Sequence, residues 1–580
     1  ITRALQEAFA RPTGGNPNDG DPVVATLHSH AARLLRENPA AVQGRRFRFL
    51  LDHEEKVMLY DIAPRVPQFL TDSERVKELN RLESMWAEQR TLDDARFAGA
   101  VNEWLVFHGG MHVGEVVFLA TNAIQAGALP IAGFKHVFVD EYQDLTECEQ
   151  TFVDLLVAAD GSIVVLGDDD QSIYGFRFNH PEGLSAFPQD ELRRATVEPI
   201  PLPDNHRCAR QIVTLANEIA AYVGSAKEPM VPARPEEGIV EFVEWESLDD
   251  EIAGLAEVIS TRLAARADNT ILVLVTRQFM GYRLKALIGD DAVTTFREQV
   301  LSVEFVRERF TLASLLADED DAVAIRAWLA LHHTKPSQAT HRNVGAYRSA
   351  TESGRYGSDL LAGIADASVK LQGDGKENIE ARAIQFLAFK RDFPADLVAG
   401  IELLFDSALV NTMPGRHAPA NESPEDRRTR ERLEQQDRDK ARGDFDLLRR
   451  SAIALVETLD EPSLASVIDT LRYRIGTLAP LLEDDHQPRV RIMTLHGAKG
   501  LEEESVIVCG LAHEMIPGPP KRDRLENLAH GREQQRLLYV AATRAKNELI
   551  LSWSDCIQSA DTYANGIVQN PRGWARNGAY

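Results

Sequence analysis

The sequence has few cysteines, and the ones present are scattered. Only four occur in 580 residues, and they form neither a CxxC pair nor a zinc-ligand spacing: Cys148, Cys208, Cys509 and Cys556. This pattern excludes a small domain held together by disulfides and argues against a zinc module. It predicts a reduced, cytoplasmic protein.

Long apolar runs are also missing. The longest, such as Phe152–Ala159 and Ile271–Val275, are far shorter than the roughly 20 residues that span a bilayer. The first residues, ITRALQEAFARP, contain no apolar segment of the kind found in signal peptides. We therefore expect neither a transmembrane helix nor a secretory leader, and no membrane partner.

Positive charge is scarce as well. The chain has 64 Lys and Arg against 89 Asp and Glu, a formal net charge of −25. Such an acidic protein is a poor candidate for coating nucleic acids non-specifically. The 44% content of hydrophobic residues is typical of globular proteins, and the length is enough for three to four domains.

Short β-branched runs alternate with helical stretches along most of the chain, which predicts an α/β fold with parallel sheets. The predicted strands are Pro22–Thr26, Lys135–Asp140, Ser162–Leu166, Gly238–Trp245, Thr270–Thr276, Val490–Thr494, Ser505–Cys509 and Glu548–Ser552. Several end directly on polar residues. Because ligands of open α/β sheets lie at the carboxyl ends of the strands, the chemistry is expected there.

Two stretches depart from this alternation. Residues 33–125 and 336–485 are predicted to be mainly helical, so the chain is expected to form two α/β cores that each carry a helical insertion. Residues 422–442 mix both signs of charge at helical spacing, which favours a solvated helix over an arm that contacts DNA.

The strand at 136–139 ends in two adjacent carboxylates, Asp140 and Glu141. Mg²⁺ prefers oxygen ligands, usually one or two carboxylates together with phosphate oxygens. Asp140, with Glu141 beside it, is the predicted metal ligand, and Glu141 is the predicted general base for an attacking water. A strand followed by an acidic first turn of a helix is the alternative interpretation of this short motif.

The next strand leads into a segment, GDDDQSIYGFR at 167–177, that joins polar and aromatic groups. Gln171 carries both a donor and an acceptor, so it can bridge a γ-phosphate and a water. Tyr174 and Phe176 offer flat faces for base stacking. This combination suits an enzyme that couples the state of a nucleotide to movement along a strand.

DEYQD at 140–144 followed by GDDDQSIYGFR resembles motifs II and III of the UvrD/Rep/PcrA-type superfamily 1 DNA helicases. Residues 23–35 resemble motif Ib, in which Thr26 and His28 match positions that touch the DNA backbone. Residues 202–217 resemble motif IV, in which Arg207 matches a residue that reaches the γ-phosphate. His206 replaces the tyrosine with which the family usually stacks on adenine.

Two segments near the end extend the resemblance. Residues 490–510 resemble motif V, which implies DNA-backbone contacts for Thr494 and His496 and nucleotide contacts for Gly500 and Glu502, the latter on the ribose. Glu503 stands where the family commonly has an aromatic residue, within the acidic run 502–504. Residues 533–552 resemble motif VI, which implies that Arg544 is an arginine finger.

The family's P-loop, GxxxxGK[ST], does not occur in this sequence. A fragment of a complete helicase and a natural relative without a P-loop are both compatible with this. The catalytic residues Asp140, Glu141, Gln171, Arg207 and Arg544 favour the fragment. The chain as given is expected to hydrolyse ATP poorly, because half of the phosphate cradle is absent.

The resemblance implies two RecA-like cores, at 1–32 with 126–200 and at 201–335 with 486–580. It implies helical insertions at 33–125 and 336–485. It also implies ATP and Mg²⁺ as cofactors, single-stranded DNA and its junctions with duplex as partners, and 3′→5′ movement with unwinding in DNA repair or recombination. A non-catalytic DNA-repair scaffold is the alternative function.

Overall fold

The computed structural model divides into two compact units, which are described separately. Unit 1 comprises residues 1–137, 151–162 and 298–483, and unit 2 comprises residues 138–150, 163–297 and 484–580. The structure describes residues 22–555 except 43–44, 91–94, 132, 174–177, 190–196, 226, 267–268, 297–299, 332–342, 417, 419–421, 478–480, 483–487, 513–514 and 517–523.

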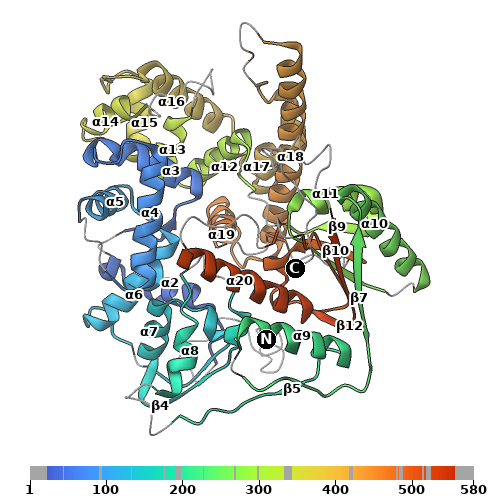
Figure 1. The fold of residues 1–580 in the computed structure, drawn as a ribbon. Helices are drawn as coiled ribbons and strands as arrows, with labels where there is room; N and C mark the ends of the chain where they lie inside the picture. Colours follow the sequence, from blue (N-terminus) through green and yellow to red (C-terminus); the bar gives the residue numbers. More distant parts are fainter. Residues whose placement is uncertain are drawn as a thin grey trace. The chain divides into compact units, whose positions relative to one another are not determined.

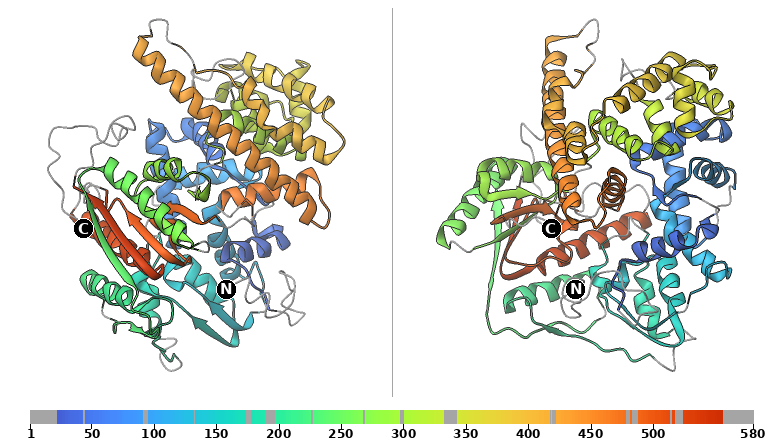
Figure 2. Two further views of the ribbon diagram at one scale, coloured as in Figure 1. Left: turned by 90° about the vertical axis from the view of Figure 1, so that its right-hand side faces the viewer. Right: turned by 180° about the vertical axis from the view of Figure 1, so that it is seen from behind.

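The centre of unit 2 is a parallel sheet of six strands (Figure 2), in the order β7-β12-β11-β8-β10-β9. The strands are β7 (Ile239–Trp245), β8 (Ile271–Val275), β9 (Ala292–Thr294), β10 (Val490–Thr494), β11 (Glu503–Cys509) and β12 (Ala545–Ser554). Thr494 therefore lies at the carboxyl end of an interior strand, next to the edge strand β9.

Helices cover both faces of this sheet, as its continuous apolar strands require. Leu272 and Leu274 of β8 pack in one apolar cluster with α9 (Arg210–Val223) and α20 (Arg524–Ala542). Alternate residues of the same strand, including Val273, pack on the other face with α10 (Leu248–Ala265) and α11 (Gln278–Ile288). All five residues of β8 are buried, which explains why this run was predicted as a core strand.

A second sheet pairs β3 (Phe134–Val139) with β4 (Val157–Val165), joined through α7 (Glu147–Leu155). The Phe134 N–H donates to the Leu156 carbonyl and the Leu166 N–H to the Val139 carbonyl, so the strands run in the same direction. The division between the two units passes through all three elements. The α/β fold class with parallel sheets is confirmed.

The strand predicted at Pro22–Thr26 is not formed. Thr26 has an extended backbone, but residues 22–26 pair with no other described strand. Thr26 instead begins α2 (Leu27–Glu37), where its hydroxyl accepts a hydrogen bond from the Ser29 N–H at 3.2 Å. A threonine at a helix N-cap satisfies a backbone donor that would otherwise lack a partner, and this local role accounts for the extended backbone before it.

Unit 1 is mainly helical. It includes most of the two stretches predicted to be helical, 33–125 and 336–485, and also helices between 304 and 330, which had been predicted to belong to the second α/β core. Besides α2, its helices are α3 (Asp52–Ile62), α4 (Asp72–Ala87), α5 (Ala95–His108), α6 (Val116–Gln125), α12 (Glu304–Ala317), α13 (Ala322–Ala330), α14 (Val344–Thr351), α15 (Gly357–Ala365), α16 (Lys376–Arg391), α17 (Leu397–Phe405), α18 (Pro424–Thr458) and α19 (Leu464–Gly476). Short strands β1 (Arg48–Phe49) and β2 (Gly110–Met111) pair beside them.

The charged run at 422–442 forms the first half of α18, the longest helix among the described residues (Figure 1). Arg430 pairs with Glu422 at 2.7 Å and with Glu434 at 2.8 Å, while most neighbouring side chains are exposed. The prediction of a solvated helix is confirmed. No helix in the described part of the chain is long and apolar enough to cross a membrane.

A buried histidine of unit 1 predicts how its stability depends on pH. The Nδ1–H of His108 donates to the Trp104 carbonyl at 2.9 Å, so Nε2 accepts from the Tyr347 hydroxyl at 3.0 Å and the ring is neutral. Burial lowers the pKa of His108 from 6.5 to about 4. Between these values the unfolded chain binds a proton that the folded chain does not, so this stabilisation is complete above pH 6.5 and is lost as the pH falls toward 4.

We expect His108→Gln to reduce the slope of unfolding free energy against pH by about 1.4 kcal/mol per pH unit in this window. Urea titrations between pH 4 and 7 measure the slope. The exposed His136→Gln is the control and should keep the parent slope. An unchanged slope in His108→Gln would mean that His108 is already protonated in the fold.

Candidate nucleotide and nucleic-acid site

The two predicted catalytic carboxylates directly follow β3. Asp140 is exposed, and its Oδ1 accepts a hydrogen bond from the Glu141 N–H at 3.1 Å. Glu141 has φ 54°, in the left-handed region that non-glycine residues rarely adopt. This conformation costs about 1 kcal/mol or more and is held only where neighbouring groups fix it. The Glu141 side chain therefore leaves the backbone in a different direction from that of a residue in a regular turn between a strand and a helix.

Gln143 is one of the groups that fix Glu141. Its side chain is completely buried, and its Nε2 donates to Glu141 Oε2 at 2.6 Å while its Oε1 accepts from the Asp168 N–H at 3.0 Å. A Cβ on Gly167 would lie 2.4 Å from that Oε1, so glycine is required there. Gln143 was not predicted from the sequence. Its neighbours in the sequence do not show that its side chain connects Glu141, after β3, with Asp168, after β4.

Lys499 is a second residue that the sequence did not single out. It follows the short helix η12 (Leu495–Ala498), and its side chain is only 6% exposed. Its ammonium lies 2.7 Å from Asp144 Oδ2 and 3.6 Å from Glu141 Oε2, and it donates to the Gln171 carbonyl at 2.9 Å. One lysine thus links the acids after β3, the Gln171 segment and the segment after β10.

Gln171 and Arg544 are in direct contact. Arg544 is 2% exposed, and its Nη2 donates to Gln171 Oε1 at 3.1 Å. Its other guanidinium hydrogen bonds go to the Val540 and Leu501 carbonyls and to the Thr543 hydroxyl, and no carboxylate of the described residues forms an ion pair with it. Burial, with nearby Arg207, lowers the pKa of Arg544 to about 10. The group is still charged at pH 7, so it is a buried cation held in a fixed orientation and paired with no acid in the part of the chain that the structure describes.

Arg207 lies beside this arginine and is paired with an acid. Its Nε donates to Glu502 Oε2 at 2.8 Å, and Lys546 lies 2.8 Å from Glu502 Oε1. Hydrogen bonds from Lys546, together with those from Arg207, lower the pKa of Glu502. His206 is exposed, and Gly500 has φ 79°, a conformation that favours glycine.

The acidic run that departs from the family pattern has an explanation in local pairing. Glu503 accepts from Arg491 at 2.8 Å and also from the Thr270 hydroxyl. Glu504 accepts from the side-chain amide of Asn547. Glu503 therefore links β11 to β10 across β8, and Glu504 links β11 to β12; of the three acids, Glu502 is the one that contacts Arg207.

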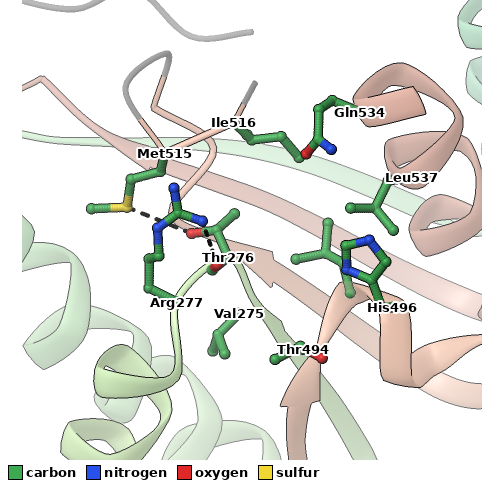
Figure 3. A pocket seen from close by; sticks show the side chains of 10 residues that line it. Val275, Thr276, Arg277, Thr494, His496, Met515, Ile516, Gln534 and Leu537 are labelled. Carbon is green, nitrogen blue, oxygen red and sulfur yellow. Dashed lines mark hydrogen bonds between the residues drawn. The ribbon is translucent and has the colours of Figure 1, made fainter. Parts of the chain in front are cut away.

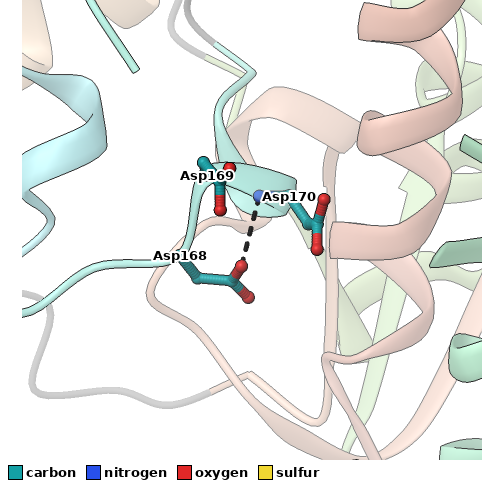
Figure 4. A group of neighbouring side chains, drawn as sticks. All are labelled: Asp168, Asp169 and Asp170. Carbon is teal, nitrogen blue, oxygen red and sulfur yellow. Dashed lines mark hydrogen bonds between the residues drawn. The ribbon is translucent and has the colours of Figure 1, made fainter. Parts of the chain in front are cut away.

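Three consecutive aspartates, Asp168, Asp169 and Asp170, form a compact acidic group (Figure 4), in which their carboxylate oxygens lie close enough together to hold a metal ion. Lys227 forms ion pairs with all three. Burial alone would lower the pKa of Lys227, but the three carboxylates outweigh it and raise the pKa. This lysine, which the sequence did not predict, offsets part of the negative charge of the three aspartates.

Two family models match the chain in the segments that build this site. The model of the UvrD/REP helicase N-terminal domain matches residues 130–191, and that of the UvrD-like helicase C-terminal domain matches residues 445–556. The first contains Glu141 and Gln171, and the second contains Lys499 and Arg544. In these two segments the chain is similar to UvrD-like helicases.

Relatives with this family name share about a quarter of their aligned residues with the chain. The ATP-dependent DNA helicase UvrD1 of Mycobacterium tuberculosis is 27% identical over 459 residues, which are 76% of this chain and 57% of the relative. The ATP-dependent DNA helicase Rep of Escherichia coli is 25% identical over 438 residues, 72% of this chain and 59% of the relative. The chain thus spans less than two thirds of each relative's length.

The predicted DNA contacts of this UvrD-like protein are only partly brought together. Tyr174 and Phe176 lie outside the described residues. Thr26 and His28 belong to unit 1, where Thr26 caps a helix. Thr494 and His496 belong to unit 2 and line one pocket (Figure 3). Burial lowers the pKa of His496, so its imidazole is neutral at pH 7.

Proposed function

We propose that this protein is part of an ATP-dependent DNA helicase or translocase. It would couple ATP hydrolysis to 3′→5′ movement on single-stranded DNA and to unwinding of duplex at its junctions, in DNA repair or recombination. One observation carries this proposal: the buried Arg544 donates to Gln171, while Lys499 joins Gln171 to Glu141. Polarity and pathway rest on the family resemblance.

The donors at the end of β3 fit a hard divalent cation. The Asp140 carboxylate is exposed, and carboxylate oxygens are the ligands that Mg²⁺ takes alongside phosphate oxygens. Asp140 would hold the ion, which when bound neutralises charge on the transferring phosphates. Glu141 would orient the attacking water and take its proton, with Gln143 fixing the carboxylate at 2.6 Å.

The two arginines supply the positive charge. Arg544 would stabilise charge on the transferring phosphoryl group, since its planar fork is already oriented and lacks a competing acid. Arg207 would reach the γ-phosphate after giving up Glu502, an exchange that suits a half-exposed pair of modest strength. Gln171 contacts Arg544, so a movement of Arg544 on nucleotide binding would also move Gln171. The segment that follows Gln171 carries the predicted base-stacking residues and would move with it.

The names of the relatives support the same function, since those proteins are ATP-dependent DNA helicases. The experiment compares this chain with a longer polypeptide that carries a P-loop segment ahead of it. We expect weak ATP hydrolysis from the chain alone. The longer form should show DNA-stimulated hydrolysis and unwinding of a duplex with a 3′ single-stranded tail.

Several results would count against this function. Rapid turnover by the chain alone would show that it does not need the P-loop cradle. DNA binding without any nucleotide turnover in the longer form would favour the alternative of a non-catalytic repair scaffold. Unwinding only from a 5′ tail would reverse the proposed polarity.

A further inference from the structure

One edge of the six-stranded sheet of unit 2 is open. In the part of the chain that the structure describes, β7 pairs with β12 over its whole length and with no other strand (Figure 2). The Trp245 carbonyl accepts a hydrogen bond from the Asp555 N–H at 2.8 Å, on the β12 side. Because successive residues of a strand direct their N–H and carbonyl groups to opposite sides, those of Val240, Phe242 and Glu244 point away from β12. This edge therefore presents main-chain groups that no described strand pairs.

β7 lacks most of the features that keep an edge strand from pairing further. Natural edge strands are often very short, or are interrupted by proline or by a bulge. β9, at the opposite edge of the same sheet, has three residues, whereas β7 has seven, with no proline, glycine or lysine, and its register against β12 is continuous. Its Phe242 is 61% exposed and its Ile239 is 50% exposed.

The two exposed apolar side chains lie on opposite faces of the sheet. Side chains alternate along a strand, so Phe242 shares the face of Val240, which packs in the cluster that contains α9 and α20. Ile239 shares the face of Val243 and Trp245, which pack in the cluster that contains α10 and α11. A further strand beside β7 would therefore bury apolar surface on both faces.

The segment around β7 carries only negative charge. Residues 236–251 contain eight acids and no lysine, arginine or histidine. Glu241 is paired with Arg262 at 3.1 Å, but Glu244 and Glu246 are exposed and form no ion pair with the described residues. Such a surface repels the phosphates of DNA. It also repels a second copy of this chain, which would bring the same acids to a symmetric interface. The charge instead complements a basic segment.

We propose that the β7 edge binds an extended basic segment of a partner protein, which adds to the sheet as a further strand. Main-chain hydrogen bonds to Val240, Phe242 and Glu244 would hold the segment. Its lysines or arginines would lie beside Glu244, and its apolar residues would cover Phe242. In this mode of recognition, main-chain pairing gives affinity and alternate side chains give specificity. The proposal concerns a protein partner and goes beyond the nucleotide and DNA chemistry proposed above.

The first test measures binding of a fluorescein-labelled peptide of alternating lysine and valine to the full chain by anisotropy. A peptide with glutamate in place of lysine should not bind. Glu244→Lys should weaken binding of the lysine peptide about fivefold, the upper value for one exposed ion pair, and should improve binding of the glutamate peptide. Asp290→Lys places the same charge change on an exposed acid beside β9, at the opposite edge of the sheet, and should leave both affinities unchanged.

Main-chain pairing is tested separately at Phe242. Phe242→Pro removes an N–H that faces away from β12, and an edge strand tolerates proline at such a position. Phe242→Ala removes the same aromatic ring but keeps the N–H. The proline variant should bind the lysine peptide about tenfold more weakly than the alanine variant, because a hydrogen bond is lost and its acceptor on the peptide is left without a partner. Equal affinities of the two variants would show that the peptide does not pair with the strand.

Three other results would overturn the proposal. If the parent chain binds neither peptide, the edge is closed by another segment of the chain or takes no basic strand. If both peptides bind equally well, charge plays no part in recognition. If sedimentation shows a dimer of the parent chain that Glu244→Lys and Phe242→Pro convert to a monomer, a second copy occupies the edge.

Thermal unfolding of all variants checks that they fold. If Phe242→Pro is unstable, a lysine peptide that is N-methylated at every residue replaces it in the test. This peptide cannot donate main-chain hydrogen bonds and should not bind the parent chain. Binding as tight as that of the unmodified peptide would show that no strand is added.

Discussion

Replacing Glu54 with glutamine should destabilise unit 1 by about 3–5 kcal/mol. Glu54 is 1% exposed and is shared by two arginines: Arg48 donates to its two oxygens at 2.6 and 2.7 Å, and Arg472 donates to both at 3.0 Å. Burial alone would raise the pKa of Glu54, but the two guanidinium groups outweigh it and hold the pKa well below its usual range. The neutral amide would leave both buried arginines short of negative charge.

The expected loss of stability is large because the substitution leaves buried arginines without their partner, not because the intact ion pair contributes much to stability. An intact buried ion pair contributes little compared with well-packed apolar residues, because desolvation offsets its attraction. Its loss is severe because the remaining partners cannot regain water. Arg48 also donates to Asp321 at 2.8 Å, and Arg472 donates to the Ser314 hydroxyl at 2.5 Å. Glu54 therefore links α3 to β1 and α19, and the two arginines extend this network to the N-cap of α13 and to α12.

Urea unfolding followed by tryptophan fluorescence measures this change, since Trp86, Trp104 and Trp328 all lie in unit 1. Glu103→Gln is the matched control. Glu103 forms an ion pair with Arg65, but the Glu103 side chain is 62% exposed. Exposed pairs of this kind contribute about 1 kcal/mol or less to stability. A loss below 1 kcal/mol in Glu54→Gln would show that water reaches the arginines.

The sequence predicted the strands well where burial on both faces leaves an unmistakable apolar run. β8 is such a run. β10 includes the partly buried Arg491 and Thr494, yet Val490–Thr494 was predicted with the boundaries that the structure has. The short β9 was not predicted, because three residues with mixed burial give no periodic signal. Pro22–Thr26 was predicted wrongly, because the same extended backbone also precedes a capped helix.

Site residues could be predicted from the sequence only where the residue type, within a motif, indicates its chemical role. Glu141, Gln171, Arg207 and Arg544 were named from their motifs, and the structure brings Gln171 and Arg544 within 3.1 Å. Lys499 was not named, because its carbonyl partner on Gln171 lies 328 residues away. A lysine in a polar loop resembles any solvated lysine until the fold is known.

The buried ion pairs of unit 1 were hidden for the same reason. Arg48 and Asp321 are separated by 273 residues, and nothing near either residue in the sequence indicates its partner. Pattern-based reasoning assigns such charges to solvent, which is correct for most of α18. Only tertiary packing shows which charges are enclosed, so neither Glu54 nor its arginines could be recognised from the sequence.

Arg544→Lys should lower kcat for ATP hydrolysis by about 10³- to 10⁵-fold, the range known for arginine fingers. This corresponds to about 4–7 kcal/mol of lost transition-state stabilisation. Lysine keeps the charge but lacks the planar fork. The present guanidinium donates to Gln171 Oε1 and to the Val540 and Leu501 carbonyls at once, so its position is fixed before any phosphate arrives. A flexible ammonium would have to be ordered during the reaction.

DNA-stimulated hydrolysis is measured in the longer, P-loop-bearing form, together with the affinity for a non-hydrolysable ATP analogue.

Glu141→Gln should also abolish turnover while sparing analogue binding, because it removes the base and not the phosphate contacts. Arg234→Lys is the structural control: Arg234 donates to the Arg207 and Lys546 carbonyls and to Asn547, and the change should alter kcat by less than tenfold. Equal losses in Arg234→Lys and Arg544→Lys would mean that Arg544 only supports the fold. A kcat within tenfold of the parent in Arg544→Lys would mean that charge alone suffices there.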